Sequence, residues 1–177
     1  MTIDHTAPHW LVTVTGADKP GIIAAIATVL AENEVDVEDV SMTRLSGNFA
    51  MILLARGGNE AALRRHLIAT AGQLEMKIHL ESASSDVSSA EPNAFISAAG
   101  PNRVGIVAGI SRALADHDVN IIEMSTRLLE RTRVPVYLVQ IECRLEGEWS
   151  QVADALASVA EKLGIDLRFE PMQSSDL

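Results

Sequence analysis

Residues Gly16 to Ser41 read GADKPGIIAAIATVLAENEVDVEDVS, and a second copy of this stretch lies 100 − 16 = 84 residues further along the chain. That copy, from Gly100 to Ser125, reads GPNRVGIVAGISRALADHDVNIIEMS. Gly21, Ile22 and Leu30 are among the residues that return unchanged. An internal repeat of this length predicts two similar folding units.

Each copy has the pattern of a strand, a glycine-containing turn, a helix and a second strand. In the first turn Asp18 is a candidate N-cap and Pro20 suits a first helical turn, while Asn102 holds the cap position in the second copy. After each turn the large apolar residues fall on one helical face, which predicts amphipathic helices. These residues are Ile22, Ile23, Ile26, Val29 and Leu30 in the first copy, and Ile106, Val107, Ile110, Ala113 and Leu114 in the second.

The residues around the first copy complete an alternating β-α-β-β-α-β pattern. A strand over 10–15 leads into the glycine turn, and the Ser46-Gly47-Asn48 turn joins the second strand to a third over 49–55. A second helix from Ala62 to near Gly72 and a fourth strand over 74–82 follow. The order is that of the ferredoxin-like fold, an α+β plan with an antiparallel four-stranded sheet and helices on one face.

The second half repeats this plan. We expect domains over 8–82 and 93–171, a small and polar linker over 83–92, and a C-terminal tail over 172–177. Residues from Pro171 onward should fray. Within the second domain the predicted strands are 93–99, 119–129, 134–145 and 165–170, and the helices are 104–117 and 149–163.

Two strand features indicate more than the bare plan. The second strand of each copy changes its alternation phase part-way, after Val37 and after Ile121, which predicts a β-bulge in both. The third strand, 49–55, is apolar on both faces, although a sheet with helices on one side should be polar on the other. We therefore expect another sheet or subunit to cover it, as in a homo-oligomer.

Composition excludes several classes of function. The formal net charge of −10 argues against direct nucleic-acid binding, which needs clustered Lys and Arg. A lone cysteine, Cys143, excludes an internal disulfide and fits a reducing compartment, and the five histidines form no metal-binding spacing. No basic leader precedes an apolar run and no run could cross a bilayer, so we expect a cytoplasmic protein without metal or cofactor.

The segment Asp18-Lys19-Pro20-Gly21-Ile22, followed by a helix and Val35-Asp36-Val37, resembles the ACT domain, a small regulatory module of amino-acid metabolism. The resemblance covers both halves of the chain. Two such modules without an enzyme domain resemble the glycine cleavage system transcriptional repressor family. The resemblance implies that an amino acid binds where the first loop of one module faces the second strand of a neighbour.

Helix N-termini independently favour a carboxylate at these loops, because their free N–H groups carry partial positive charge. Asp36 and Asn120 hold the family position at the start of the second strand. Asn120 fits that position better because an ionised Asp36 only accepts hydrogen bonds, whereas Val104 replaces Pro20 in the second loop, so one site could be vestigial. The predicted ligand-binding residues are Asp18, Lys19, Pro20, Gly21, Ile22 and Asp36 in the first module, and Asn102, Arg103, Val104, Gly105, Ile106 and Asn120 in the second.

Structural roles remain open for the same residues. Asp18 and Asn102 could be ordinary caps, Gly21 and Gly105 could be packing spacers, and Lys19 and Arg103 could be solvated. The sequence favours a non-catalytic sensor of an amino acid, with glycine suggested by resemblance only, acting through a partner transcription factor or enzyme. The alternative is a ligand-free scaffold for oligomerisation or docking. An enzyme ranks last, because no catalytic set of residues is recognisable.

Overall fold

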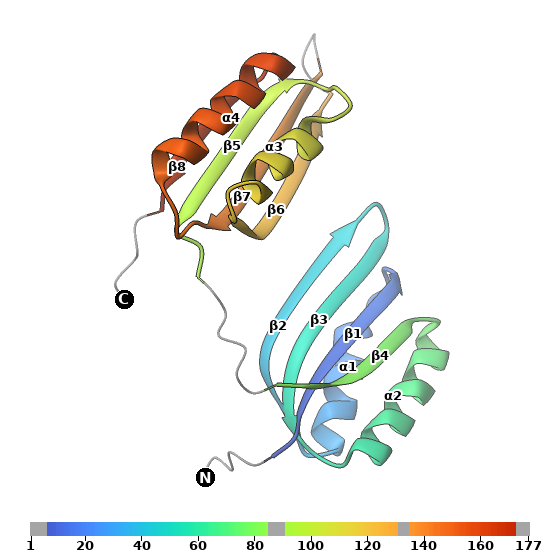
Figure 1. The fold of residues 1–177 in the computed structure, drawn as a ribbon. Coiled ribbons are helices and arrows are strands. Elements are labelled where there is room, and N and C mark those ends of the chain that lie inside the picture. Colours follow the sequence, from blue (N-terminus) through green and yellow to red (C-terminus); the bar gives the residue numbers. More distant parts are fainter. Residues whose placement is uncertain (1–6, 85–90, 131–134, 173–177) are drawn as a thin grey trace. The chain divides into compact units, whose positions relative to one another are not determined.

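The computed structural model describes residues 7–84, 91–130 and 135–172 and divides into two compact units, Met1–Val87 and Ser88–Leu177 (Figure 1). Each unit has the β-α-β-β-α-β order and one four-stranded antiparallel sheet, so the predicted fold is confirmed. We describe each unit by itself.

The first unit has the strand order β2-β3-β1-β4, and both of its helices cover one face of the sheet (Figure 1). Val12 and Val14 of β1 are fully buried and point to the helices, where they share a core with Ile26 and Leu30. The elements are β1 His9–Ala17, α1 Ile22–Glu32, β2 Val35–Leu45, β3 Asn48–Gly57, α2 Glu60–Leu74 and β4 Lys77–Ala83.

The second unit repeats this arrangement with the order β6-β7-β5-β8 and with α3 and α4 on one face (Figure 1). Ile96 of β5 takes the place of Val12, and Ile110 and Leu114 of α3 complete its core. The elements are β5 Ala94–Pro101, α3 Ile106–Ala115, β6 Asn120–Leu129, β7 Val136–Arg144, α4 Trp149–Leu163 and β8 Asp166–Pro171.

The predicted bulge is present in both second strands. The pairing of β2 with β3 shifts register between Val37 and Asp39, and that of β6 with β7 shifts between Ile121 and Glu123. Each shift occurs where the apolar alternation changes phase. The extra residue lets both halves of the strand keep their apolar side chains towards the helices.

Several predicted boundaries are wrong by a few residues. Leu74 was expected in a strand but ends α2, where it packs on the first core, and β4 begins only at Lys77. The helix expected over 104–117 is α3, which is shorter at both ends. Pro171 was expected to fray, yet it ends β8, and the Met172 amide donates to the carbonyl of Asn93 at 2.8 Å.

Other expectations fall partly outside the described residues. These are the middle of the linker over 85–90, the strand start at residue 134 and the tail over 173–177.

The two sheets differ on the face turned away from the helices, which we call the outer face. On the first sheet Ile52 of β3 lies at the centre of this face and is 51% exposed. The matched position of the second sheet is Gln140 of β7, because Thr13 pairs with Ile52 as Ser97 pairs with Gln140. Within the described part of the first unit, no element covers this outer face, whose central strands carry the apolar residues Ile52, Leu54 and Leu11.

Candidate functional site

The helices α1 and α3 begin in the same way, at a glycine. Gly21 and Gly105 are the N-caps, with φ of 94° and 100°, and neither helix has a side-chain cap. The prediction of caps at Asp18 and Asn102 is therefore wrong, because the chain continues for three residues beyond each before the helical turn closes. Pro20 likewise precedes the cap instead of occupying the first turn.

No side chain caps the first-turn amides of α1 and α3. The first amides of any helix have no intrahelical acceptor, and in α2 the Asn59 side chain accepts from the Ala62 amide at 3.1 Å. Neither α1 nor α3 has such a side chain or an acidic residue in its first turn. A Cβ built on Gly21 or Gly105 would meet no atom within 4 Å, so the space beside each helix start is open.

Lys19 and Arg103 fasten the turn to the second helix of their own unit. Lys19 Nζ lies 2.5 Å from Glu75 Oε2, and Glu75 is the C-cap of α2. Arg103 Nη1 donates to the carbonyl of Leu163, the last residue of α4, at 3.0 Å. Both cations sit at a helix C-terminus, whose partial negative charge favours them. The Lys19 ammonium, through its hydrogen bond and then its charge, lowers the pKa of Glu75 below its usual range.

Asp18 has a comparable structural role in the first unit. Its carboxylate forms an ion pair with Arg44 of β2, and its backbone amide donates to the carbonyl of Gly47 at 2.9 Å. These contacts tie the turn to the β2–β3 hairpin. The position that matches Arg44 in the second unit is Leu128, so Asn102 cannot form the same ion pair.

Asp36 and Asn120 lie at the far end of the helix from the glycine turn. Asp36 is the second residue of β2, which follows the C-terminus of α1, whereas Gly21 precedes its N-terminus (Figure 1). The 11 residues of α1 span about 16 Å. Both Asp36 and Asn120 are exposed. No single unit therefore brings its own loop and its own second-strand residue together.

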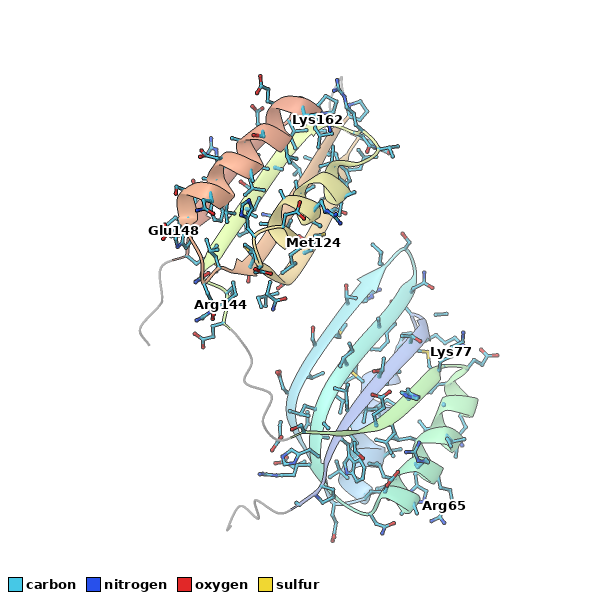
Figure 2. All side chains as sticks on the ribbon, in the orientation of Figure 1. Arg65, Lys77, Met124, Arg144, Glu148 and Lys162 are labelled. Carbon is cyan, nitrogen blue, oxygen red and sulfur yellow. The ribbon has the colours of Figure 1, made fainter. Side chains whose placement is uncertain are left out.

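Two hollows lie near the glycine turns. One, of about 510 Å³, lies beside the end of β1 and is lined by Thr15, Thr43, Asn48 and Lys77, but by none of the predicted residues. The other, of about 400 Å³, lies between α3 and α4 and includes Gly105. Lys162, on the last turn of α4 (Figure 2), is also one of its lining residues by position.

Two properties of the ionisable groups in the described residues bear on chemistry, namely metal-binding clusters and shifted pKa values. No group of three or more His, Cys, Asp or Glu side chains in residues 7–84, 91–130 and 135–172 is placed to hold a metal ion. Burial raises the pKa of the Cys143 thiol to about 11, so it is a neutral core residue near pH 7. Across the same residues, no helix combines the length and apolar character required to span a membrane.

The repeated fold and the paired glycine turns agree with the protein family whose model the sequence matches. A family model described as the ACT domain matches residues 9–81 and again 94–170, which together are most of the chain.

This chain belongs to the ACT-domain family.

Each of its two ACT units accounts for one match, and proteins of this family are of regulatory type. ACT domains typically bind small ligands such as amino acids.

Smaller relatives match part of the chain. The UPF0237 protein YjhC of Lactococcus lactis is 36% identical over 73 residues, which are 40% of this chain and 84% of that protein. The UPF0237 protein MK1213 of Methanopyrus kandleri is 54% identical over 44 residues, 25% of this chain. The chain spans about half the length of MK1213, with 49% covered.

Two solved structures resemble the whole tandem. A protein from Galdieria sulphuraria has a TM-score of 0.83 at 26% identity and covers 94% of this chain and 99% of its own. A candidate glycine cleavage system transcriptional repressor has a TM-score of 0.75 at 13% identity, covering 96% and 99%. The second likeness shows a common fold.

A third hollow, of about 690 Å³, lies on the outer face of the second ACT unit, and sequence reasoning missed it. Its polar lining includes Arg127, Gln140 and Arg168, with Ser97 at its centre. Ser97 pairs in register with Gln140 on one side and Arg168 on the other. The sequence contains evidence for this polar face, because polar residues at alternate positions of the predicted strands indicate the face away from the core.

Proposed function

We propose that this ACT-domain protein is a non-catalytic regulator that binds a small amino acid, glycine being the favoured candidate, at the glycine turns of its two units. The observation that carries the proposal is the open start of α1 and of α3. Each has an N-cap glycine in the left-handed conformation, first-turn amides without a side-chain cap, and no neighbour within 4 Å of a Cβ at that glycine. Such an end fits the carboxylate of an amino acid.

The residues of the proposed site divide into two sets. The backbone at Gly21 and Ile22, or at Gly105 and Ile106, would hold the carboxylate. Because about 16 Å of helix separates Asp36 from Gly21, the second-strand residue must come from a neighbouring unit, of the same chain or of another. The amide of Asn120 can both donate to and accept from a ligand.

The remaining predicted residues support the site indirectly. Lys19 and Arg103 already bind the end of the second helix, and Asp18 binds Arg44. Pro20 and Val104 stand next to the cap glycines, and Val104 is fully exposed. We assign these five, together with Asn102 beside Arg103, to holding or bordering the turn.

A regulator without chemistry must pass ligand occupancy to a partner. The net charge of −10 makes a direct contact with nucleic acid unfavourable, so the partner would be a protein, either a transcription factor or a metabolic enzyme. The ligand can act only through a difference in affinity between two arrangements of the protein. The glycine cleavage repressor name belongs to a structural neighbour at 13% identity, and it makes transcriptional control the first role to test.

The second candidate is an ACT scaffold without a ligand. The uncovered apolar outer face of the first unit favours this reading, because it fits a protein partner without any small molecule. Calorimetric titration with glycine and a panel of other amino acids separates the two functions, since the scaffold predicts no binding heat.

Substitution of the cap glycines tests the site itself. Gly21→Ala and Gly105→Ala each add a methyl group in the open space where the carboxylate would lie, so each should reduce amino-acid affinity. Gly47→Ala is a matched control, because Gly47 also has positive φ (77°) and open space but lies in the β2–β3 hairpin. Equal affinity in all three variants, or no binding by the native chain, would refute the proposed site.

A further inference from the structure

Four rows of the outer face cross all four strands of the first sheet, and three of them form its centre. The fourth, beyond the row of Asp39, carries Asp36, Arg56, His9 and Ala83. The middle row carries Ser41, Ile52, Thr13 and His79, which pair in register. The rows on either side are listed in the same strand order, β2-β3-β1-β4. They are Thr43, Ala50, Thr15 and Lys77 on one side, and Asp39, Leu54, Leu11 and Glu81 on the other.

We propose that this outer face packs against the same face of a second copy of the chain, with the two-fold axis lying along the middle row. The rotation exchanges the other two rows, so that each residue of one row faces its strand-mate in the other. The proposal does not depend on the ligand proposed above. It explains why a half-exposed isoleucine occupies the centre of a sheet face that should be polar.

Side-chain size is complementary under this rotation. Ala50 and Thr15 are the small members of the central strands, and Leu54 and Leu11 are the large ones. Each leucine of one copy would therefore face a small residue of the other. Facing sheets stack about 10 Å apart, which leaves room for one large and one small side chain at each contact.

Charge is complementary as well. Lys77 is the first residue of β4 (Figure 2). By register it shares a face of the strand with His79 and Glu81. The rotation places Lys77 of each copy opposite Glu81 of the other, which gives two equivalent ion pairs at the rim. Glu81 contacts His79 Nε2 at 2.7 Å in its own chain, and 57% of its side chain remains exposed.

The other way of facing the two sheets is unfavourable. With the axis along the strands, β2 of one copy faces β4 of the other and each row faces itself. Asp39 would then oppose Glu81, and Leu54 would oppose Leu11 while Ala50 opposed Thr15. Like charges would meet at the rim and the apolar centre would be uneven.

The outer face of the second sheet does not have this pattern of complementary side chains. Gln140 stands where the first sheet has Ile52, and Glu142 stands where it has Leu54. Burial of these two polar groups without partners would be costly. The exposed surface therefore assigns the contact to the first unit of each copy.

The size of the face sets the expected strength. The three central rows, about 6.8 Å apart on four strands about 4.8 Å apart, cover roughly 400 Å² in each copy. A standard interface buries about 800 Å² per partner. The dimer should therefore be weak and reversible, and it should form only as the protein concentration rises.

Sedimentation velocity of the full chain, from micromolar to near-millimolar concentration, tests the pairing. We expect a monomer–dimer equilibrium that Ile52→Gln weakens at least tenfold. Ile68→Gln is the matched control, since Ile68 is 63% exposed on α2, and it should leave the dissociation constant unchanged. A chain that stays monomeric throughout, or equal effects of the two variants, would overturn the proposal.

Charge reversal tests the direction of the axis. Lys77→Glu and Glu81→Lys should each weaken the dimer, because each sets like charges opposite one another twice. The double variant should restore it. If the double variant dimerised more weakly than either single variant, the assigned axis would be wrong. If Gln140→Asp abolished the dimer and Ile52→Gln did not, the contact would lie on the second sheet and the proposal would be overturned.

Discussion

The open space beside Gly21 makes a quantitative prediction that Gly57 helps to test. Both glycines lie in the first unit and have nearly the same φ, 94° and 101°. A Cβ on Gly21 would meet nothing within 4 Å, whereas a Cβ on Gly57 would lie 2.8 Å from the carbonyl oxygen of Glu34. Alanine at the two positions therefore adopts a similarly unfavourable positive φ but meets a different steric contact.

The strain of an L-residue in the left-handed region is about 1–2 kcal/mol. Alanine also restricts the unfolded chain, which returns about 0.4–1 kcal/mol. Gly21→Ala should therefore lower the free energy of unfolding by about 1 kcal/mol. At Gly57 the clash is with a backbone atom that cannot rotate away, which adds about 1–3 kcal/mol, as overpacking does elsewhere.

The assay is urea unfolding followed by the fluorescence of one tryptophan. The chain has two, Trp10 in the first unit and Trp149 in the second. Trp149→Phe leaves Trp10 as the reporter and keeps an aromatic ring against Phe169, whose ring centroid lies 5.0 Å from that of Trp149. Trp10 is buried, and its Nε1 donates to the carbonyl of Gly57 at 2.7 Å, so its emission should follow unfolding of the first unit.

Two results would refute this reasoning. If Gly21→Ala cost as much stability as Gly57→Ala, the space beside α1 would not be open in solution. If Gly21→Ala cost nothing, its positive φ would not hold in solution. A modest loss of stability combined with a large loss of amino-acid affinity is the result that the proposed site requires.

Three further predictions follow from named contacts. Lys19→Met removes the charge that lowers the pKa of Glu75, so an NMR titration should find this pKa raised. Because a lowered carboxyl pKa stabilises the fold only above it, the variant should also lose less stability than the native chain as the pH falls through the acid range. Because the pKa of the Cys143 thiol is about 11 in the folded chain, the thiol of the unfolded chain ionises at a lower pH. The free energy of unfolding should therefore fall between about pH 9 and 11, and Cys143→Ala should reduce this pH dependence in urea unfolding. Asn59→Ala should cost the first unit about 1 kcal/mol by Trp10 fluorescence, whereas Asp18→Ala, which removes no cap, should cost less.

Periodic features of the fold could be predicted from the sequence because they depend on neighbours along the chain. The phase change after Val37 located the bulge. The apolar spacing from Ile22 located the buried face of α1, except that Ile23, expected on that face, is 50% exposed. The helix starts were less accurate. Asp18 is a good cap by residue type, but the cap position belongs to Gly21, whose left-handed conformation ends the turn.

Contacts between distant residues could not be predicted from spacing. Lys19 and Glu75 are 56 positions apart, and Arg103 and Leu163 are 60 apart. These contacts explain why the paired cations recur in both copies, which the sequence alone left open between ligand binding and solvation. The distance from Gly21 to Asp36 could have been predicted from the length of the helix between them. Both residues were instead assigned to one site because they match the same family motif.

The length of α1 has a thermodynamic consequence for any ligand at its start. A binding site that combines the N-terminus of a helix in one unit with the strand that follows the C-terminus of a helix in another is complete only when two units meet. If the two units belong to different chains, ligand binding and assembly of the chains are thermodynamically linked. The ligand then favours assembly, and dilution of the protein lowers the affinity for the ligand. Measured affinity would then depend on how much protein is in the cell, so the amount of regulator would set the threshold at which it responds.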